Sequence, residues 1–426
     1  MELYSWLCSF INLERGLGGG PSSATEEHFK LDRIRILAEL AGHPELSAPV
    51  IHVAGSKGKG SVVAMTAAIL ETAGIKTARF MSPHVSDWRE RISRGDGTFF
   101  PDTVYELAGA ELKKNYEEYR RLYSGGEPTY FELMTMLFFL CARLEQCTAM
   151  AVETGLGGRL DATNIVDPVV SVITVIEKEH TEYLGNTLKE IAGEKAGIIK
   201  KNRPIISAGQ EPEVLAVLKQ KAEEQNAFFI QVTDPVTVPG MRLVGKIHAY
   251  NAALAIHALR TAFPFIDEKS IENGLQTITL PARFEKIRSD PPLIADGAHT
   301  PLSIEHCAET FCDHFGNGGI LLFGCAADKD AAAMAEILLP HFNHCIITAT
   351  GSFRANDPTA VYETFISEAK KNKNNGQRTA ISCISDTAAA IESALQLSKE
   401  EKLPVLCCGS FYLAAEIRKL LMYSVL

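Results

Sequence analysis

One short stretch of the chain combines the residue types that bind a nucleotide phosphate. An apolar run is followed by a turn with glycines at 55, 58 and 60 and then by an apolar helical pattern. Glycines let backbone N–H groups turn inward, and the positive end of a helix favours an anion. Lys59 could place its charge on the β- and γ-phosphates, and Ser61 could offer a hydroxyl to Mg²⁺. The turn therefore predicts a phosphate-binding loop.

The loop departs from the strict Walker A pattern in one position. That pattern has Gly-Lys followed directly by Ser or Thr, whereas Gly60 separates Lys59 from Ser61. An ordinary glycine-rich connection between a strand and a helix is the alternative that this stretch alone leaves open.

Two further residues stand where an α/β sheet usually binds its ligands. Glu153 ends an apolar strand and opens a glycine-rich segment, and His180 follows the strand expected over 169–176. Because hard oxygen ligands accompany the Mg²⁺ of a nucleotide, Glu153 is a candidate metal ligand. A solvated glutamate at the strand end and a structural histidine are the alternatives for these two residues.

A third candidate is a lysine that lies between two glycines of a helical pattern. Gly193 and Gly197 lie inside a helical pattern, where each glycine costs about 1 kcal/mol relative to alanine. Both glycines therefore predict close backbone packing, with Lys195 between them. A surface lysine is the ordinary alternative.

Composition limits the classes of protein that fit. The chain has 426 residues, 46% hydrophobic and 22% charged, which predicts a globular protein of two domains. A net charge of −10 argues against nucleic-acid binding, and no run of uncharged apolar residues is long enough to predict a membrane span. The ten cysteines form no CxxC pair, so we expect reduced thiols and a cytoplasmic location. We also expect a monomer.

Strand and helix patterns alternate along the chain, which is typical of a mostly parallel α/β sheet. We expect a P-loop-type domain over residues 1–285 and a smaller Rossmann-like α/β domain over 286–426. Helices are expected over residues 31–40, 62–70, 133–144, 329–339 and 411–422. The expected strands are 49–54, 149–153, 169–176 and 204–207 in the first domain, and 292–295, 319–324, 344–348 and 404–408 in the second.

From about Leu31 to Leu420 the sequence resembles the folylpolyglutamate synthase and dihydrofolate synthase family, within the Mur-type ATP-dependent amide ligases. No single segment is decisive, but their order and completeness are specific. The segments that carry the resemblance are His52–Ser61, Ser82–His84, Glu90–Ile92, Thr129–Glu132, Glu153–Asn164, His180–Gly185, Glu194–Lys200, Pro281–Glu285, Asp296–His299, Asp328–Asp330 and Gly409–Leu413.

The resemblance implies a role for each candidate residue. Lys195 matches a lysine that becomes N-carbamylated, and the catalytic set would be Lys59, Lys195 and His299. The implied Mg²⁺ ligands are Ser61, Ser82, Glu153, His180 and Lys195. The implied ATP-binding residues are Gly55, Ser56, Lys57, Gly58, Lys59, Gly60, Ser61, Asn251, Arg283 and Asp296.

The chain departs from the family pattern at a few positions. Lys57 stands where the family usually has Asn, Glu179 where it has Asp, and Thr300 where it has Asn. Ile247 and His248 replace a usual His-Gln pair, which leaves the adenine contacts in that region open. None of these changes removes an implied catalytic residue.

The resemblance implies an ATP-dependent ligase that adds L-glutamate to tetrahydrofolate and also to dihydropteroate, through an acyl phosphate. Two alternatives remain. A Mur ligase that acts on a cell-wall peptide precursor would share Lys59, His180 and Lys195. A non-catalytic P-loop nucleotide switch would need neither an acceptor nor a carbamate at Lys195.

Overall fold

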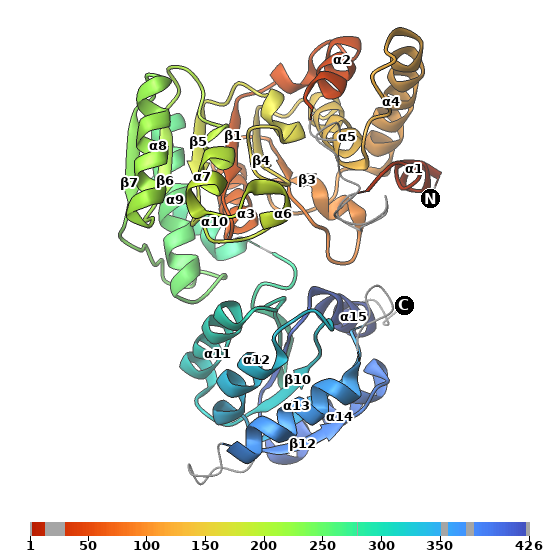
Figure 1. The fold of residues 1–426 in the computed structure, drawn as a ribbon, viewed down its shortest axis with the longest axis vertical. Coiled ribbons are helices and arrows are strands. Elements are labelled where there is room, and N and C mark those ends of the chain that lie inside the picture. The colour runs from red at the N-terminus through yellow and green to blue at the C-terminus, as the bar shows by residue number, and fades with distance from the viewer. Residues whose placement is uncertain (1, 13–29, 279, 351–356, 372–378, 423–426) are drawn as a thin grey trace. The chain divides into compact units, whose positions relative to one another are not determined.

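The computed structural model describes residues 2–12, 30–278, 280–350, 357–371 and 379–422 (Figure 1). The chain divides into two compact units. The first contains Met1–His84, Trp88–Arg242 and Ile247–Thr279, and the second contains Val85–Asp87, Leu243–Lys246 and Leu280–Leu426.

The first unit is built on a seven-stranded sheet with the order β3-β2-β4-β1-β5-β6-β7. All neighbouring pairs are parallel except β2 with β3. The four expected strands are confirmed, and β2, β3 and β7 were missed. The strands are β1 (Val50–Ala54), β2 (Thr77–Phe80), β3 (Ile92–Arg94), β4 (Ala149–Glu153), β5 (Val170–Ile173), β6 (Ile205–Ala208) and β7 (Phe229–Val232).

Helices accompany this sheet, and buried parallel strands need such cover because both of their faces are apolar. The helices are α1 (Glu2–Leu7), α2 (Asp32–Leu40), α3 (Lys59–Thr72), α4 (Asp102–Leu122), α5 (Tyr130–Leu144), α6 (Thr181–Leu184), α7 (Leu188–Ala196), α8 (Pro212–Glu224), α9 (Lys246–Ala262) and α10 (Glu268–Thr277). Short 3₁₀ segments are η4 (Pro44–Leu46), η5 (Trp88–Arg91) and η6 (Ala162–Ile165). No helix among these described residues, or in the described part of the second unit, is long and apolar enough to cross a membrane.

Helix α5 shows how sequence sets a boundary. Its first residue follows Thr129, whose hydroxyl accepts from the Glu132 N–H while the Glu132 carboxylate accepts from the Thr129 N–H. This capping box satisfies donors that the helix itself cannot. The same buried carboxylate accepts from Nε of Arg33 on α2, with both oxygens within 3.2 Å of it. The cap therefore also joins two helices in the core.

The second unit has a six-stranded sheet with the order β12-β11-β10-β13-β9-β8, parallel except for β8 against β9. Its four expected strands are confirmed, whereas β8 and β12 were missed. The strands are β8 (Glu285–Ser289), β9 (Pro292–Ala295), β10 (Ile320–Phe323), β11 (His344–Ile347), β12 (Ala380–Cys383) and β13 (Val405–Cys408). The helices are α11 (Pro301–Phe315), α12 (Ala331–Leu338), α13 (Pro358–Lys371), α14 (Thr387–Glu401) and α15 (Phe411–Met422), with η7 (Leu339–His341).

A chain of polar side chains runs through the otherwise apolar core of the first sheet. The Thr163 hydroxyl donates to the Asp161 carboxylate, and the Thr163 oxygen lies 2.8 Å from Nε2 of His52 on β1. Since the hydroxyl proton is used on Asp161, His52 must donate through Nε2–H. Its Nδ1 atom is buried with no hydrogen-bond partner in the described part of the chain. His52 is therefore held neutral: burial, and secondly Lys200, lowers its pKa to about 3.

Buried neutral His52 should make stability sensitive to acid. The unfolded chain binds this proton below its ordinary pKa of about 6.5, whereas the folded chain does not bind it until about pH 3. Stability is therefore fully present above pH 6.5 and is lost as the pH falls. Between about pH 7.5 and about pH 5.0, the free energy of unfolding should fall by about 2 kcal/mol less in His52→Gln than in the parent chain. Urea unfolding at both pH values measures this difference, and equal losses would contradict a neutral His52.

The expectation of close packing at both helical glycines is half right. A Cβ on Gly197 would lie 2.3 Å from Cα of Arg159, so this position does need glycine. A Cβ on Gly193 would meet nothing within 4 Å in the part of the chain that is described, because that face of α7 is open to solvent. The prediction for Gly193 was wrong.

Alanine at these two positions should therefore have opposite effects. Gly193→Ala should raise the free energy of unfolding by about 0.5–1 kcal/mol, because glycine costs this much backbone entropy in a helix. Gly197→Ala should lower it by about 1–3 kcal/mol, because the backbone of the 158–159 loop must move. Thermal unfolding of both variants tests the pair. A destabilised Gly193→Ala would mean that α7 packs on something at that face.

Candidate functional site

The predicted phosphate-binding loop lies between the carboxyl end of β1 and the N-terminus of α3. Gly55 has a φ of 146°, and a Cβ there would lie 1.8 Å from Oγ1 of Thr174. Gly58 has a φ of 90° and precedes the first helical residue. Both positions need glycine, the first for space and both for the backbone conformation. The loop conformation therefore depends on glycine at these two positions.

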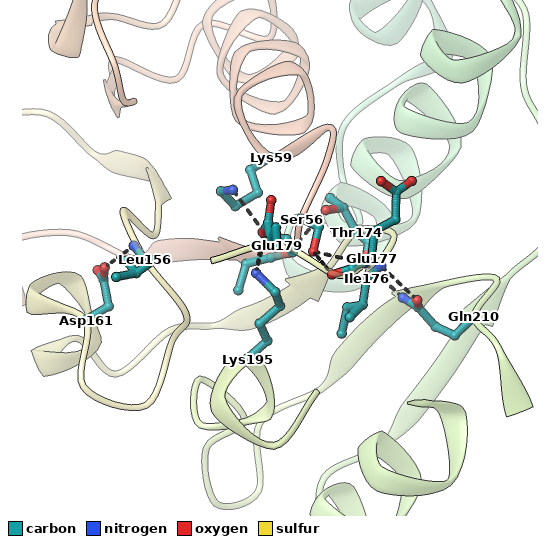
Figure 2. Close-up of polar contacts among 12 residues, drawn as sticks. Ser56, Lys59, Leu156, Asp161, Thr174, Ile176, Glu177, Glu179, Lys195 and Gln210 are labelled. Carbon is teal, nitrogen blue, oxygen red and sulfur yellow. Dashed lines mark hydrogen bonds and ion pairs between the residues drawn. The ribbon is translucent and has the colours of Figure 1, made fainter. Parts of the chain in front are cut away.

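Not all of the loop's N–H groups can face a phosphate. The N–H groups of Ser56 and Lys57 both donate to the Val175 carbonyl, at 2.9 and 3.4 Å. The Ser56 hydroxyl also donates to the Glu177 carbonyl and accepts from the Glu177 N–H (Figure 2). In this conformation the donors for an anion are the first N–H groups of α3, which a helix leaves without internal partners.

Two lysines meet at one carbonyl oxygen behind the loop. Nζ of Lys59 lies 3.0 Å from the Gly55 carbonyl oxygen, and Nζ of Lys195 lies 2.8 Å from the same atom. Lys195 reaches it from α7 and also donates to Oε1 of Glu179 at 3.0 Å (Figure 2). Two ammonium groups this close repel each other, and an anion beside them would relieve the repulsion.

Lys195 is not the surface lysine that its sequence context allowed. Its side chain is 1% exposed. Burial, and next the charge of Lys59, lowers the pKa of Lys195 to about 8 although Glu179 opposes the change. For Glu179, burial would raise the pKa, but Lys195 and then Lys59 outweigh it and leave the pKa below its ordinary value. A neutral amine is consequently accessible at Lys195 near neutral pH.

Glu153 is buried at the end of β4, beside Val53 of β1 in the parallel register. Its Oε2 accepts the N–H of Ser82 at 3.1 Å and lies 3.2 Å from where a Cβ on Gly60 would be. The structure thus brings Glu153, Ser82 and the start of α3 together. Ser61, one residue further along α3, is buried.

His180 lies in an exposed left-handed turn, with φ 47° and ψ 43°, at the N-terminus of α6. Although the residue is exposed overall, partial desolvation of its ring lowers its pKa; Glu179 and then Glu182 raise it, and the two site lysines lower it further. His180 is thus within the electrostatic field of the lysine pair. No hydrogen bond from His180 to Glu153 or Ser82 is present in the described structure.

Asn251 on α9 lies against the loop. A Cβ on Gly58 would come within 2.5 Å of Oδ1 of Asn251, so this glycine admits the amide. The side chain is buried, and its Nδ2 has no hydrogen-bond partner among the described residues. A buried amide donor without a partner costs free energy, which a ligand at the loop could recover.

The remaining predicted residues form a separate group in the second unit. Asp296 follows β9, and its carboxylate accepts the N–H groups of Phe284 and Ala298, both at 2.7 Å. Burial raises the pKa of Asp296, and Arg283 opposes the rise. Nδ1 of His299 lies 2.7 Å from the Gly297 carbonyl, so Nδ1 donates and Nε2 points elsewhere. The Arg283 guanidinium lies over the Phe411 ring, 4.4 Å from its centroid.

Sequence reasoning missed two contributors to these groups. Glu179 was noted only as a replacement for Asp, whereas its carboxylate is the ion-pair partner of Lys195. Phe411 was quoted only inside a motif, whereas its ring contacts Arg283 and lies 5.6 Å from the His299 ring. For Glu179 the signal was present, because it is adjacent to the histidine that was singled out.

Two family descriptions match this chain. The Mur ligase middle domain matches residues 53–259, and the Mur ligase, glutamate ligase domain, matches residues 282–411. Among curated proteins, the dihydrofolate synthase/folylpolyglutamate synthase of Bacillus subtilis is 32% identical, over 91% of this chain and 94% of its own length. The folylpolyglutamate synthase of Lacticaseibacillus casei is 30% identical, over 92% of this chain and 94% of its own length.

Solved structures agree with the sequence comparison. Mycobacterium tuberculosis folylpolyglutamate synthase complexed with ADP and AMPPCP has a TM-score of 0.80 and 28% identity, covering 92% of this chain and 95% of that one. E. coli FolC in complex with DHPP and ADP has a TM-score of 0.79 and 28% identity, covering 99% and 98%. Because identity at this level extends through both matched domains and not only the phosphate-binding loop, the chain belongs to the folylpolyglutamate synthase and dihydrofolate synthase family of the Mur ligase superfamily.

Proposed function

We propose that this protein is an ATP-dependent ligase that joins L-glutamate to folates and to dihydropteroate. Its relatives of both names, matched over more than nine-tenths of their length, support the substrate class. The observation that carries the chemistry is the buried Lys195, held between the Gly55 carbonyl and Glu179 next to Lys59.

The first unit would bind the triphosphate of ATP. The N–H groups at the start of α3 and the ammonium of Lys59 supply positive charge at the γ-phosphate. The loop set is Gly55, Ser56, Lys57, Gly58, Lys59, Gly60 and Ser61, with Ser56 and Lys57 bracing the loop on Val175. The partnerless Nδ2 of Asn251 would donate to the nucleotide.

The residues around Glu153 fit a magnesium ion. No cluster of three or more His, Cys, Asp or Glu side chains suited to a metal occurs in the described ranges. Mg²⁺ typically takes only one or two protein carboxylates and completes its shell with phosphate and water. Glu153, Ser61, Ser82 and His180 would hold it, joined by a carbamate on Lys195. Bound Mg²⁺ would neutralise charge on the transferring phosphate.

Carbamylation of Lys195 is chemically accessible here. The neutral amine attacks CO₂, a C–N bond forms and one proton leaves, so an anionic carboxylate replaces the ammonium. With a pKa of about 8, roughly a quarter of this lysine is neutral near pH 7.5. The new anion would repel Glu179 unless a cation lay between them. The conversion and the metal site therefore support each other.

The reaction would proceed in two displacements. A carboxylate of the folate attacks the γ-phosphorus of ATP, and the bond to the bridging oxygen breaks so that ADP leaves. The amine of L-glutamate then attacks the acyl carbon, and phosphate and a proton are released. Arg283 would contact the phosphates, Asp296 the ribose, and His299 would stabilise developing charge on the phosphate. The ten cysteines are all free thiols, which supports a location in the reducing cytoplasm. We also propose that the enzyme is a monomer.

The acceptor is the first property to measure. Purified protein with Mg-ATP and L-glutamate should release ADP when either dihydropteroate or tetrahydrofolate is added, and the glutamylated product should appear by mass spectrometry. Turnover with only one acceptor would make the enzyme monofunctional. Stimulation by a UDP-linked muramyl peptide instead would identify a cell-wall ligase, and slow ADP release independent of any acceptor would identify a nucleotide switch.

The carbamate can be tested separately. In ¹³C-labelled CO₂ at constant pressure, the parent protein should show a carbamate carbon signal that grows as the pH rises toward about 8. Lys195→Ala should lose the carbamate signal, and its kcat should fall by at least about 100-fold. Added formate or acetate should restore part of the activity. Lys189→Ala, on the exposed face of the same helix, is the matched control and should keep both. Normal turnover by Lys195→Ala would rule out the carbamate.

A further inference from the structure

The turn that carries Arg283 has an unusual backbone. Ala282 has a φ of 54° and Phe284 a φ of 45°, so left-handed residues bracket the arginine on both sides. Residues with a side chain rarely adopt this conformation, and for a bulky aromatic residue it is a genuine outlier. Such strain persists only where surrounding contacts enforce it, and it concentrates at functional sites.

Three hydrogen bonds enforce the turn from within the second unit. The Phe284 N–H donates to Oδ2 of Asp296 at 2.7 Å, and the Gly297 N–H donates to the Ala282 carbonyl at 2.9 Å. The Ala282 N–H donates to Oε2 of Glu285 at 2.9 Å. The first two bonds join the turn to residues that follow β9. The third depends on a side chain at the start of β8.

Glu285 is itself fixed by a distant arginine. Nη1 of Arg418 on α15 lies 2.8 Å from Oε1 and 2.7 Å from Oε2 of Glu285. The Arg418 side chain is 8% exposed, so this pair is largely shielded from water. Arg418 thereby engages both carboxylate oxygens of a residue only two positions from Arg283.

The same helix also touches Arg283 directly. Phe411, the first residue of α15, presents its ring to the Arg283 guanidinium, and a Cβ on Gly297 would come within 2.3 Å of that ring. The turn is thus held at two points, its arginine by Phe411 and its backbone by Arg418 through Glu285. The two contact points are two helical turns apart on α15.

We infer that Glu285 and Arg418 are positioning residues for Arg283. The inference rests on the proposed function, in which Arg283 contacts the phosphates of ATP. The ion pair keeps Ala282 in its left-handed conformation and keeps the Glu285 carboxylate engaged with Arg418. Without Arg418, the Glu285 carboxylate would lose the partner that fixes it, and the backbone that carries Arg283 would lose that support.

A double-mutant cycle on glutamate-dependent ADP release tests the inference. Arg418→Met should lower kcat by about 10- to 100-fold with KM for the folate unchanged, because misplacing a group that contacts the reacting phosphate affects the chemical step. In an Arg283→Ala background the same change should cost less than about 2-fold. Arg418→Lys should restore part of the loss. Arg288→Met is the control and should stay near parent activity. Arg288 lies on β8, the strand that begins at Glu285, but its Nε donates to the Asp290 carbonyl.

Each contrary result identifies what failed. The positioning role alone would be overturned if the losses of the two single variants multiplied in the double variant. It would also be overturned if Arg418→Met kept its kcat while Arg283→Ala was impaired. Unimpaired Arg283→Ala would overturn the phosphate role of Arg283 and the inference with it. Thermal unfolding checks that each variant is folded. If Arg418→Met is not recovered folded, Glu285→Ala carries the same cycle, because it removes both the acceptor of the Ala282 N–H and the carboxylate that pairs with Arg418.

Discussion

The burial of Lys195 against the Gly55 carbonyl is the interaction on which the first unit's site depends. Moving an ammonium group into the protein interior is costly, and here one carbonyl and one carboxylate compensate for that cost. The carbonyl belongs to the loop, and the carboxylate to the segment after β5. The Lys195 side chain therefore joins the loop, the segment that follows β5, and α7. Its lowered pKa is a consequence of the same burial.

The loop's shape is fixed by what lies against its glycines. Thr174 occupies the space beside Gly55, Asn251 the space beside Gly58, and Glu153 lies near Gly60. Thr174 directly follows β5, Asn251 lies on α9 and Glu153 ends β4, and the parallel sheet and its helices bring the three to one end of β1. A preformed loop of this kind loses little entropy when an anion binds, since the backbone is already ordered.

The interior strands of both sheets except β2 could be predicted from the sequence, whereas β2 and the four edge strands could not. β1, β4, β5 and β6 are fully buried and mostly apolar, but β12 alternates between exposed and half-buried residues and β3 spans only three residues. Gly193 and Gly197 share one sequence context and differ only in whether the 158–159 loop lies opposite. The partner of Glu285 is 133 residues away, which no local pattern reveals.

Positive φ values occur both at helix ends and turns and inside the motifs of the proposed site. Gln146, Asn202 and Asn226 have positive φ just after a helix or in a turn, where short polar residues tolerate it. His180, Ala282 and Phe284 also have positive φ, yet each lies in a motif that the resemblance singled out. At the last two, hydrogen bonds from a buried ion pair and from Asp296 keep the strain in place. The same contacts therefore fix the backbone on both sides of Arg283, which supports the proposed positioning role.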